Sequence, residues 1–540
     1  MNRYFFILLL FLILNSCNTD KNKYTSKKIF RYNESAGINS LDPAFAKDQA
    51  NIWACNQIYN GLVELDDQLN IKPCIAKHWE ITENANLYTF TLRDDVYFIE
   101  NMCFKKNKRK VTAYDFEFSF KRIVDEKVAS PGAWIFNYVK KNKNTYEFKA
   151  LNDSTFQIRL NKAFPPFLGL LSMQYCSVIP YEAISYYGKD FRKNPVGTGP
   201  FYLKLWKEGV KMVLLKNPKY FQFEGNERLP YLDAVNISFI IDKQSVFLEF
   251  AKGNIDFMSG IDASYKDELL TVNGKLNPKY EKKFNLITQA YLNTEYLGFL
   301  IDTSTKNNNP LKIKAVRQAI NYGFDRVKMM KYLRNNIGSP AINGFIPKGL
   351  GGYDSLLTKG YYYNPDKARK LLAEAGYPNG NGLAEISLST TASYLDLCKY
   401  IQNQLADLGI KLKIDVNPPA TLRELIAKSK TPFFRGSWIA DYPDAENYLS
   451  LFYSPNFCPV GPNYTHFKNK NFDLLYEKSQ TEINDSIRFK LYKDMDQIII
   501  DEAPVVVLYY DQVLRFTQKN IKNLGSNPMN LLSLKRVNKE

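Results

Sequence analysis

The stretch Asn364-Pro-Asp-Lys-Ala-Arg-Lys-Leu-Leu-Ala-Glu-Ala-Gly-Tyr-Pro378 contains the start and stop signals of one complete helix. Its opening Asn is a preferred N-cap, and the Pro after it fits the first helical position, where a missing N–H costs nothing. Gly376 is a favourable C-cap and Pro378 prevents the helix from continuing. The sequence therefore predicts a helix over 365–375.

The residues downstream repeat this pattern and alternate it with strands. A second helical segment covers 394–408, and the run Ile410-Lys-Leu-Lys-Ile-Asp415 then has the composition of a strand. Near the carboxyl end, a predicted helix over 485–500 precedes 505–510, an apolar strand of buried type. Helix and strand alternating in this way indicate a mixed α/β lobe.

The amino-terminal part shows shorter elements. A strand is predicted at 29–32 and a helix at 51–59, and apolar residues alternate with polar ones over 87–92, as in a half-buried strand. Thr112-x-x-Asp115 is a capping box that starts a helix. The stretch Gly197-Thr-Gly-Pro200 lacks the Lys-Ser/Thr pair of a phosphate loop, so we expect a turn that enters a strand.

Length and composition indicate an ordinary globular protein of two or three domains. The chain has 540 residues, of which 45% are hydrophobic and 24% charged. The formal charge of +17 is spread along the whole chain, and the densest basic run, 105–110, is a polar connector before a helix. We expect that run to be a solvated hairpin loop, and we predict no nucleic-acid partner.

Few residues of the chain suit catalysis. The two histidines, His78 and His466, lie far apart in sequence, and neither is flanked by a nucleophile motif. This disfavours zinc chemistry and Ser-His-Asp or Cys-His catalysis, so each His is expected to be structural. Carboxylates are plentiful, but no catalytic pair stands out. We predict a protein that is not an enzyme and that needs no cofactor or metal.

Residues 1–17 indicate export. Arg3 precedes the apolar run 4–14, which is too short to span a bilayer. The run ends in Leu-Asn-Ser-Cys17, which resembles the lipobox of bacterial lipoproteins; the alternative is an ordinary signal peptide with an incidental Cys. We expect 1–16 to be a signal peptide and 17–28 a lipidated flexible linker, with Cys17 anchoring an otherwise soluble protein to the cell membrane, facing the periplasm or cell exterior.

Six further cysteines follow Cys17, at spacings that match no metal or redox motif. They are Cys55, Cys74, Cys103, Cys176, Cys398 and Cys458. An exported protein can form disulfides, but these spacings favour mostly buried free thiols with at most one or two bridges.

The stretch Arg435-Gly-Ser-Trp-Ile-Ala-Asp-Tyr-Pro-Asp444 is the best candidate for a ligand site. Asp441 can hold an ammonium group and Arg435 a carboxylate, with Trp438 and Tyr442 as apolar walls. These groups suit a zwitterion with an apolar middle, such as a short peptide; the alternative is a surface loop with a solvated ion pair. A flat strand over 435–441 spans roughly 20 Å, about twice a tripeptide, so the segment bends or Arg435 does not touch the same ligand.

Eight blocks of the chain together resemble one family. They are Ala76-Lys-His-Trp79, the 88–98 and 111–120 segments, Pro195-Val-Gly-Thr-Gly-Pro200, Asn217-Pro-Lys-Tyr220, Ala315-Val-Arg-Gln-Ala-Ile320, 364–378 and Trp438-x-x-Asp441-Tyr. In this order they resemble the family 5 extracellular solute-binding proteins, the oligopeptide and dipeptide receptors of ABC importers. The resemblance covers nearly everything from residue 29 to about 515.

This resemblance implies a fold. It is a mixed α/β, two-lobed fold of the periplasmic-binding-protein type II kind, with an extra inserted domain and a cleft that closes by hinge motion. The implied domain boundaries are 29–66, 190–290 and 501–540 for lobe I, 67–189 for the extra domain and 291–500 for lobe II.

The resemblance also implies a ligand site. Asp441 matches the residue that takes a peptide's α-ammonium, Trp438 an aromatic wall and Arg435 a carboxylate-binding Arg. Backbone groups of Ser437 and Ala440 would pair with the ligand as in strand addition, although the family often has Gly at the position of Ser437. Trp134 lies near a position that contributes an aromatic to the cleft; a plain core Trp is the alternative.

The implied function is that of a monomeric, lipid-anchored receptor. It would capture short peptides and deliver them to the permease and ATPase subunits of an ABC importer. The rivals are a family 5 receptor for a metal chelate, haem or an oligosaccharide, and a signalling or adhesion lipoprotein that retains the fold.

Overall fold

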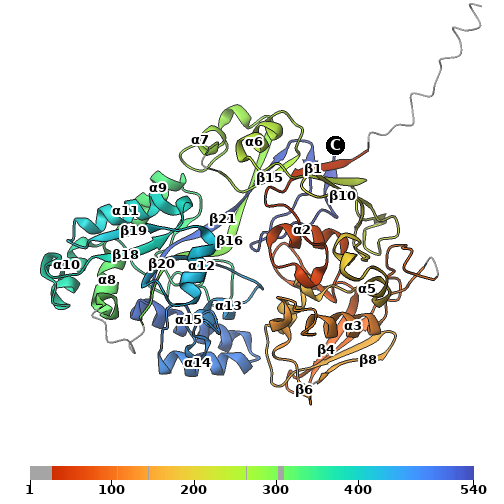
Figure 1. Cartoon of the computed structure of the whole chain (residues 1–540), viewed down its shortest axis with the longest axis horizontal. Helices are drawn as coiled ribbons and strands as arrows, with labels where there is room; N and C mark the ends of the chain where they lie inside the picture. The colour runs from red at the N-terminus through yellow and green to blue at the C-terminus, as the bar shows by residue number, and fades with distance from the viewer. Residues whose placement is uncertain (1–26, 106–107, 144, 263, 302–308) are drawn as a thin grey trace, which may run out of the picture.

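The computed structural model describes residues 27–105, 108–143, 145–262, 264–301 and 309–540. Figure 1 shows two bodies side by side, with the long strands β16 (Phe284–Phe299) and β21 (Val505–Gln518) running between them. We call the body that contains β1 (Ile29–Asn33) lobe I and the body that contains β20 (Phe433–Ile439) lobe II.

One mixed sheet of eleven strands continues through both lobes, in the order β10-β11-β14-β1-β15-β21-β16-β20-β18-β19, with β17 beside β21. Its lobe I strands are β10 (Phe201–Lys207), β11 (Lys211–Lys216), β14 (Ala234–Ser238), β1 and β15 (Phe257–Ser259). Its lobe II strands are β17 (Ser339–Pro340), β18 (Ile386–Thr390), β19 (Leu412–Val416) and β20.

The pairing of β16 with β21 is the connection between the lobes. Within lobe I, β16 residues 284–290 pair antiparallel with β21 residues 512–518. The register then shifts between Ala290 and Thr294, after which 294–298 pair with 505–510 in lobe II. A bulge of this kind bends a strand and increases its twist, so the change of direction between the lobes is built into the strand pair itself.

A smaller antiparallel sheet forms a third unit beside lobe I, coloured orange in Figure 1. Its strands, in spatial order, are β4 (Ala76–Thr82), β5 (Leu87–Leu92), β9 (Thr155–Arg159) and β8 (Phe148–Asn152). Helix α3 (Ala113–Ile123) buries Phe116 and Phe120 against this sheet. We call this unit the inserted domain.

The remaining helices and short strands complete the three units. Lobe I has α2 (Gln49–Ile58), α6 (Lys243–Ala251), α7 (Lys266–Leu269) and the hairpins β2 (Val63–Leu65) with β3 (Ile71–Pro73), β12 (Phe223–Glu224) with β13 (Glu227–Arg228) and β22 (Ile521–Lys522) with β23 (Asn538–Lys539). The inserted domain has α4 (Phe167–Leu171), α5 (Tyr181–Tyr187), β6 (Lys141–Asn142) and β7 (Thr145–Tyr146). Lobe II has α8 (Lys314–Tyr322), α9 (Arg326–Arg334), α10 (Pro365–Glu374), α11 (Leu395–Ala406), α12 (Pro419–Ala427), α13 (Glu446–Leu449), α14 (Lys470–Thr481) and α15 (Asp485–Glu502).

Hydrophobic packing groups these units into two bodies. A single continuous core joins lobe I, through Phe30 and Tyr32, to the inserted domain, through Tyr88 and Phe116. Lobe II has cores of its own, on either side of its part of the sheet. The inserted domain therefore packs as part of the lobe I body, and the domain boundaries given above remain our proposal for where the chain passes between the units.

Several local predictions are confirmed. The side chain of Asn364 caps α10 by accepting the Lys367 N–H at 2.9 Å, and Thr112 and Asp115 form the predicted capping box of α3. A Cβ at Gly197 or Gly199 would overlap the backbone of Ile58, so these glycines allow the turn before β10 to pack on the end of α2. The fold class is the predicted one.

Other predictions differ from the structure or concern residues outside the described part of the chain. Strand β21, predicted to end at 510, continues to Gln518. All six described cysteines are free thiols. The predicted signal peptide 1–16, the lipidation site Cys17 and most of the linker 17–28 lie outside the described residues. Across the part of the chain that the structure describes, no helix has the length and apolar character needed to cross a membrane.

Asp496 on α15 is a fully buried carboxyl with no cation beside it. Its oxygens accept the backbone N–H groups of Phe345 at 2.7 Å and Ile346 at 3.4 Å, and Gly344 leaves no room for a side chain there. Burial raises the pKa of Asp496 to about 7, with the two amide hydrogen bonds opposing the rise. The folded chain therefore binds a proton that the unfolded chain releases near pH 4.

The stability of lobe II should consequently fall as pH rises from about 4 to about 7, by on the order of 3 kcal/mol. We predict that Asp496→Asn removes much of this slope, because the amide has no proton to lose. Urea unfolding at pH 5, 6 and 7 measures how the free energy of unfolding depends on pH. The matched control is Asp494→Asn, a partly exposed carboxylate on the same helix. An unchanged slope in Asp496→Asn would contradict the assignment.

Candidate ligand-binding site

Strand β20 has one edge paired and one edge largely open. It pairs antiparallel with β16, with Ser437 opposite Glu295, whereas on its other side β18 meets it only at Phe434. The Ala440 N–H donates to the Leu292 carbonyl at 2.9 Å, and backbone groups alternate between the two edges of a strand. The backbone of Ser437 therefore faces the open edge, where an extended ligand can pair with it.

The same hydrogen bond changes the expectation for Ala440. Its N–H is engaged with Leu292 inside the sheet, so it is not available to a ligand. Of the two residues predicted to pair with a ligand through their backbone, only Ser437 therefore faces an edge of the strand where a ligand can bind. Ala440 instead contributes to the wall of a cavity that begins where the strand ends.

Asp441 lies directly after β20 and lines a cavity of about 220 Å³. Lobe I supplies Trp53 to this cavity, the inserted domain supplies Met173 and Tyr175, and lobe II supplies Tyr291 and Asp441. Asp441 therefore stands between the two bodies. The polar residues Lys47, Gln49, Ser172 and Gln174 also line the cavity, and aromatic walls with a few polar groups are typical of small-ligand sites.

The Asp441 carboxylate has no ion-pair partner among the described residues. The Asp441 side chain is accessible from the cavity, but protein atoms surround the cavity closely. This partial loss of hydration raises the pKa of Asp441 above its ordinary value. The one described contact that lowers the pKa of Asp441 is the hydrogen bond from the Asn447 amide, which donates to the carboxylate at 3.4 Å. A cationic group entering the cavity would replace the lost hydration and restore the charged form.

Asn447, on α13, positions both Asp441 and Trp438. Its side-chain oxygen accepts the Trp438 indole N–H at 2.8 Å and the Asp441 backbone N–H at 3.3 Å. Trp438 is half-buried against the lobe II core and does not line the cavity. The sequence analysis did not identify Asn447, because a polar residue six positions after the acid carries no distinctive signal.

Arg435 lies away from Asp441, inside lobe II. Its guanidinium forms an ion pair with the buried Glu295 of β16 and stacks over the Tyr394 ring, 3.3 Å from the ring centre. It does not line the cavity around Asp441. The strand stays extended through Ile439 instead of bending, so Arg435 and Asp441 are held apart. This arrangement corresponds to the expectation that, without a bend, Arg435 and Asp441 do not contact the same short ligand.

Tyr442 and Trp134 form a contact between the inserted domain and lobe II. Their rings lie 6.2 Å apart, and Tyr442 is buried, with its hydroxyl donating to Glu446. Close by, the Tyr138 hydroxyl donates to Gln480 at 3.4 Å. Neither Tyr442 nor Trp134 lines the cavity. The two aromatic residues therefore join the bodies beside the site and do not form its wall.

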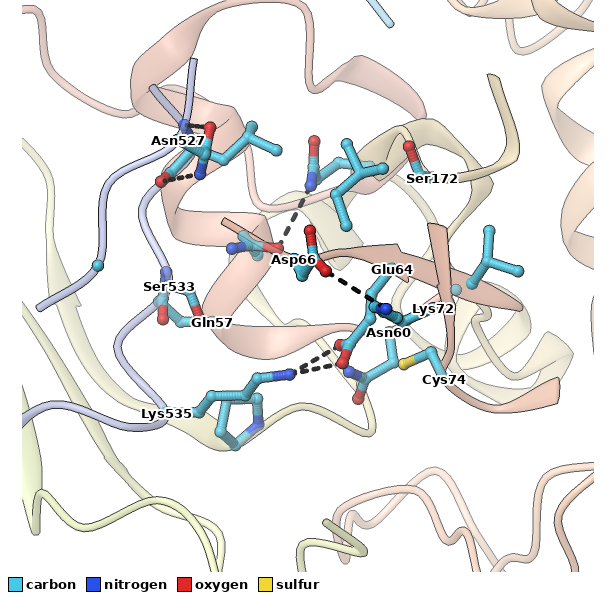
Figure 2. A pocket seen from close by; sticks show the side chains of 18 of the residues that line it. Gln57, Asn60, Glu64, Asp66, Lys72, Cys74, Ser172, Asn527, Ser533 and Lys535 are labelled. Atoms are coloured by element: carbon cyan, nitrogen blue, oxygen red, sulfur yellow. Dashed lines mark hydrogen bonds and ion pairs between the residues drawn. The ribbon is translucent and has the colours of Figure 1, made fainter. Parts of the chain in front are cut away.

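A second, more polar pocket of about 500 Å³ adjoins the first and is shown in Figure 2. The two pockets share the wall residues Leu65, Ser172, Met173, Gln174 and Leu531. Two pairs of charges in the polar pocket neutralise each other: Lys535 lies 2.8 Å from Glu64, and Lys72 lies 3.5 Å from Asp66. Asp67 also lines this pocket and has no ion-pair partner among the described residues, and burial raises the pKa of its carboxyl.

No described group of three or more His, Cys, Asp or Glu side chains is arranged to hold a metal ion. The cavity residues contributed by lobe I and by the inserted domain could not be identified from the sequence either. Trp53 and Tyr175 were not recognisable as site residues because they lie more than 260 positions from Asp441 and join it only through the fold.

The chain is similar to known proteins over most of its length. The profile of "Bacterial extracellular solute-binding proteins, family 5 Middle" matches residues 70–457. The dipeptide-binding protein DppE of Bacillus subtilis is 25% identical over 96% of this chain and 93% of its own length. The glutathione-binding protein GsiB of Salmonella typhi is 26% identical over 91% of each chain.

A solved structure matches the fold over nearly the whole chain. It is the periplasmic binding protein DppA of Helicobacter pylori in complex with the peptide STSA, which superposes with a TM-score of 0.76 at 27% identity, covering 95% of this chain and 98% of that one. Profile, relatives and fold agree: this chain belongs to family 5 of the bacterial extracellular solute-binding proteins.

Proposed function

We propose that this chain is the lipid-anchored receptor of an ABC importer, which captures short peptides between its lobes and delivers them to the permease. The observation that carries the proposal is the unpaired Asp441 carboxylate at the end of an open strand edge. Such an acid attracts a peptide's α-ammonium group, while the Ser437 backbone pairs with the peptide main chain. Together they recognise any peptide and leave its side chains unread.

The relatives support a peptide ligand, since their names specify a dipeptide, glutathione and the peptide STSA. Anchoring through Cys17 and delivery to permease and ATPase subunits follow from the lipobox and from the role of family 5 proteins in import. The rival ligands, a metal chelate, haem or an oligosaccharide, gain no specific support from the groups around Asp441.

The charge of Asp441 can be removed by a single substitution. We expect Asp441→Asn to lower peptide affinity by well over tenfold, because a buried ammonium then loses its counter-charge, while the unfolding midpoint of the ligand-free protein stays nearly the same. Native mass spectrometry of the purified protein identifies the bound peptide, and calorimetry compares that peptide with its N-acetylated form.

Acetylation should weaken binding to the wild type but have little further effect on Asp441→Asn, since both changes remove the same charge pair. Asp407→Asn, an exposed acid elsewhere on lobe II, is the control. Unaltered affinity in Asp441→Asn, or a bound ligand that is not a peptide, contradicts the proposed function.

The second prediction separates two roles for Arg435. If Arg435 serves to neutralise Glu295, Arg435→Gln leaves a buried charge unpaired and lowers stability by about 3 kcal/mol or more, and adding Glu295→Gln restores much of it. Peptide affinity should change little. Were Arg435 to bind the ligand's carboxylate instead, Arg435→Gln would weaken binding of the free peptide and spare its C-terminal amide. Urea unfolding and calorimetry give the two readouts.

A further inference from the structure

Three side chains from two segments of lobe II meet at hydrogen-bonding distance. The Ser429 hydroxyl lies 3.1 Å from the His466 Nε2 and 3.1 Å from the Cys458 sulfur. The Cys458 sulfur lies 3.4 Å from the same imidazole nitrogen. Ser429 follows helix α12, while Cys458 and His466 lie on the loops that precede α14. The cluster thus combines a thiol, a base and a hydroxyl.

The backbone of this cluster is unusual. Ser429 has a φ of 55° and His466 a φ of 52°, both in the left-handed region that non-glycine residues seldom adopt. Such a backbone conformation is strained for a non-glycine residue and persists only where its surroundings hold it. Here the imidazole is also clamped by the Phe457 ring, stacked at 4.7 Å with an angle of 6° between the planes. The geometry that aims His466 at Cys458 is therefore fixed by the fold.

The other described thiols lack a base of this kind. Burial raises the pKa of the Cys55, Cys176 and Cys398 thiols, and it raises the pKa of Cys103 to about 11. The protein has only one other histidine, His78, which lies on β4 of the inserted domain. Among the described cysteines, Cys458 alone has an imidazole in contact with its sulfur.

We propose that Cys458 is a modification site, where a thiol assisted by His466 exchanges with small disulfides. The Cys458 proton passes to the His466 Nε2, and the thiolate sulfur attacks one sulfur of the incoming disulfide. A new S–S bond forms as the old one breaks, and the departing thiolate takes the proton from His466. Cys458 ends as a mixed disulfide, and one half of the reagent leaves reduced as a free thiol.

Cys458 is 5% exposed, while Val460, two residues later on the same loop, is 94% exposed. The loop that carries the thiol therefore reaches the protein surface within two residues, and we infer that a small disulfide approaches the sulfur from this side. The place of Cys458 in the fold also matters for the ligand site, if the proposed function holds. A group attached to Cys458 would displace Ser429, which lies four residues before the start of β20, and β20 leads to Asp441.

The test is labelling of the native full chain with 5,5′-dithiobis(2-nitrobenzoate) at pH 7, with the modified sites mapped by peptide mass spectrometry. Cys458 should react at least tenfold faster than Cys103 of the same molecule. His466→Gln should slow Cys458 about tenfold and leave the rate at Cys103 unchanged, whereas His78→Gln should leave both rates unchanged.

Cys103 in each variant also reports folding, because a general loss of structure would raise its rate together with that of the buried thiols. Slow labelling of Cys458 in the native wild type overturns the proposal, and so does equal labelling in His466→Gln. Labelling needs no ligand, so its outcome is independent of whether the cavity at Asp441 binds peptides.

Discussion

The antiparallel pairing of β16 with β21 is the constraint on which the architecture depends. These two strands contribute to the sheet in both lobes, and their register shifts between Ala290 and Thr294, where the chain passes from one body to the other. Tyr291, inside that irregular segment, lines the cavity, and β20 is aligned directly on the lobe II half of β16. The direction of this strand pair therefore determines where the acid after β20 faces lobe I.

Several charged groups around the site are paired within the protein, whereas Asp441 is not. Arg435 is neutralised by Glu295, Arg334 by Asp511, and Lys535 by Glu64. Asp441 receives only the amide of Asn447. Lys47 lines the same cavity, but no ion pair joins it to Asp441. The Asp441 carboxylate is therefore a localised negative charge that a single ammonium group can balance.

Local structure was predictable from sequence where short-range chemistry decides it. The caps of α10 and the capping box of α3 act within four residues, so their boundaries could be predicted closely. Strand β21 continues past its predicted end because its residues 512–518 pair with residues 284–290 of β16, a partner that is distant in sequence. The buried Arg515 on this extension is satisfied by the Asn530 side chain and the Leu531 carbonyl, acceptors that only the folded chain brings near.

The site could be predicted only in part, for the same reason. Asp441 was identified from its own motif, but the partner that occupies Arg435 is 140 residues away in sequence. The approach of Ser429 and His466 to Cys458 likewise depends on loops whose paths no local pattern specifies. Residue type and spacing indicated which groups were present, and tertiary packing determined which of them remained free.

The ring contact of Trp134 with Tyr442 has an energetic consequence. The two bodies are joined by the strand pair and also touch at this aromatic contact. Separation of the rings would expose apolar surface that is now covered, since Tyr442 is only 4% exposed. Any movement of the two bodies away from each other is therefore opposed at a point outside the wall of the Asp441 cavity.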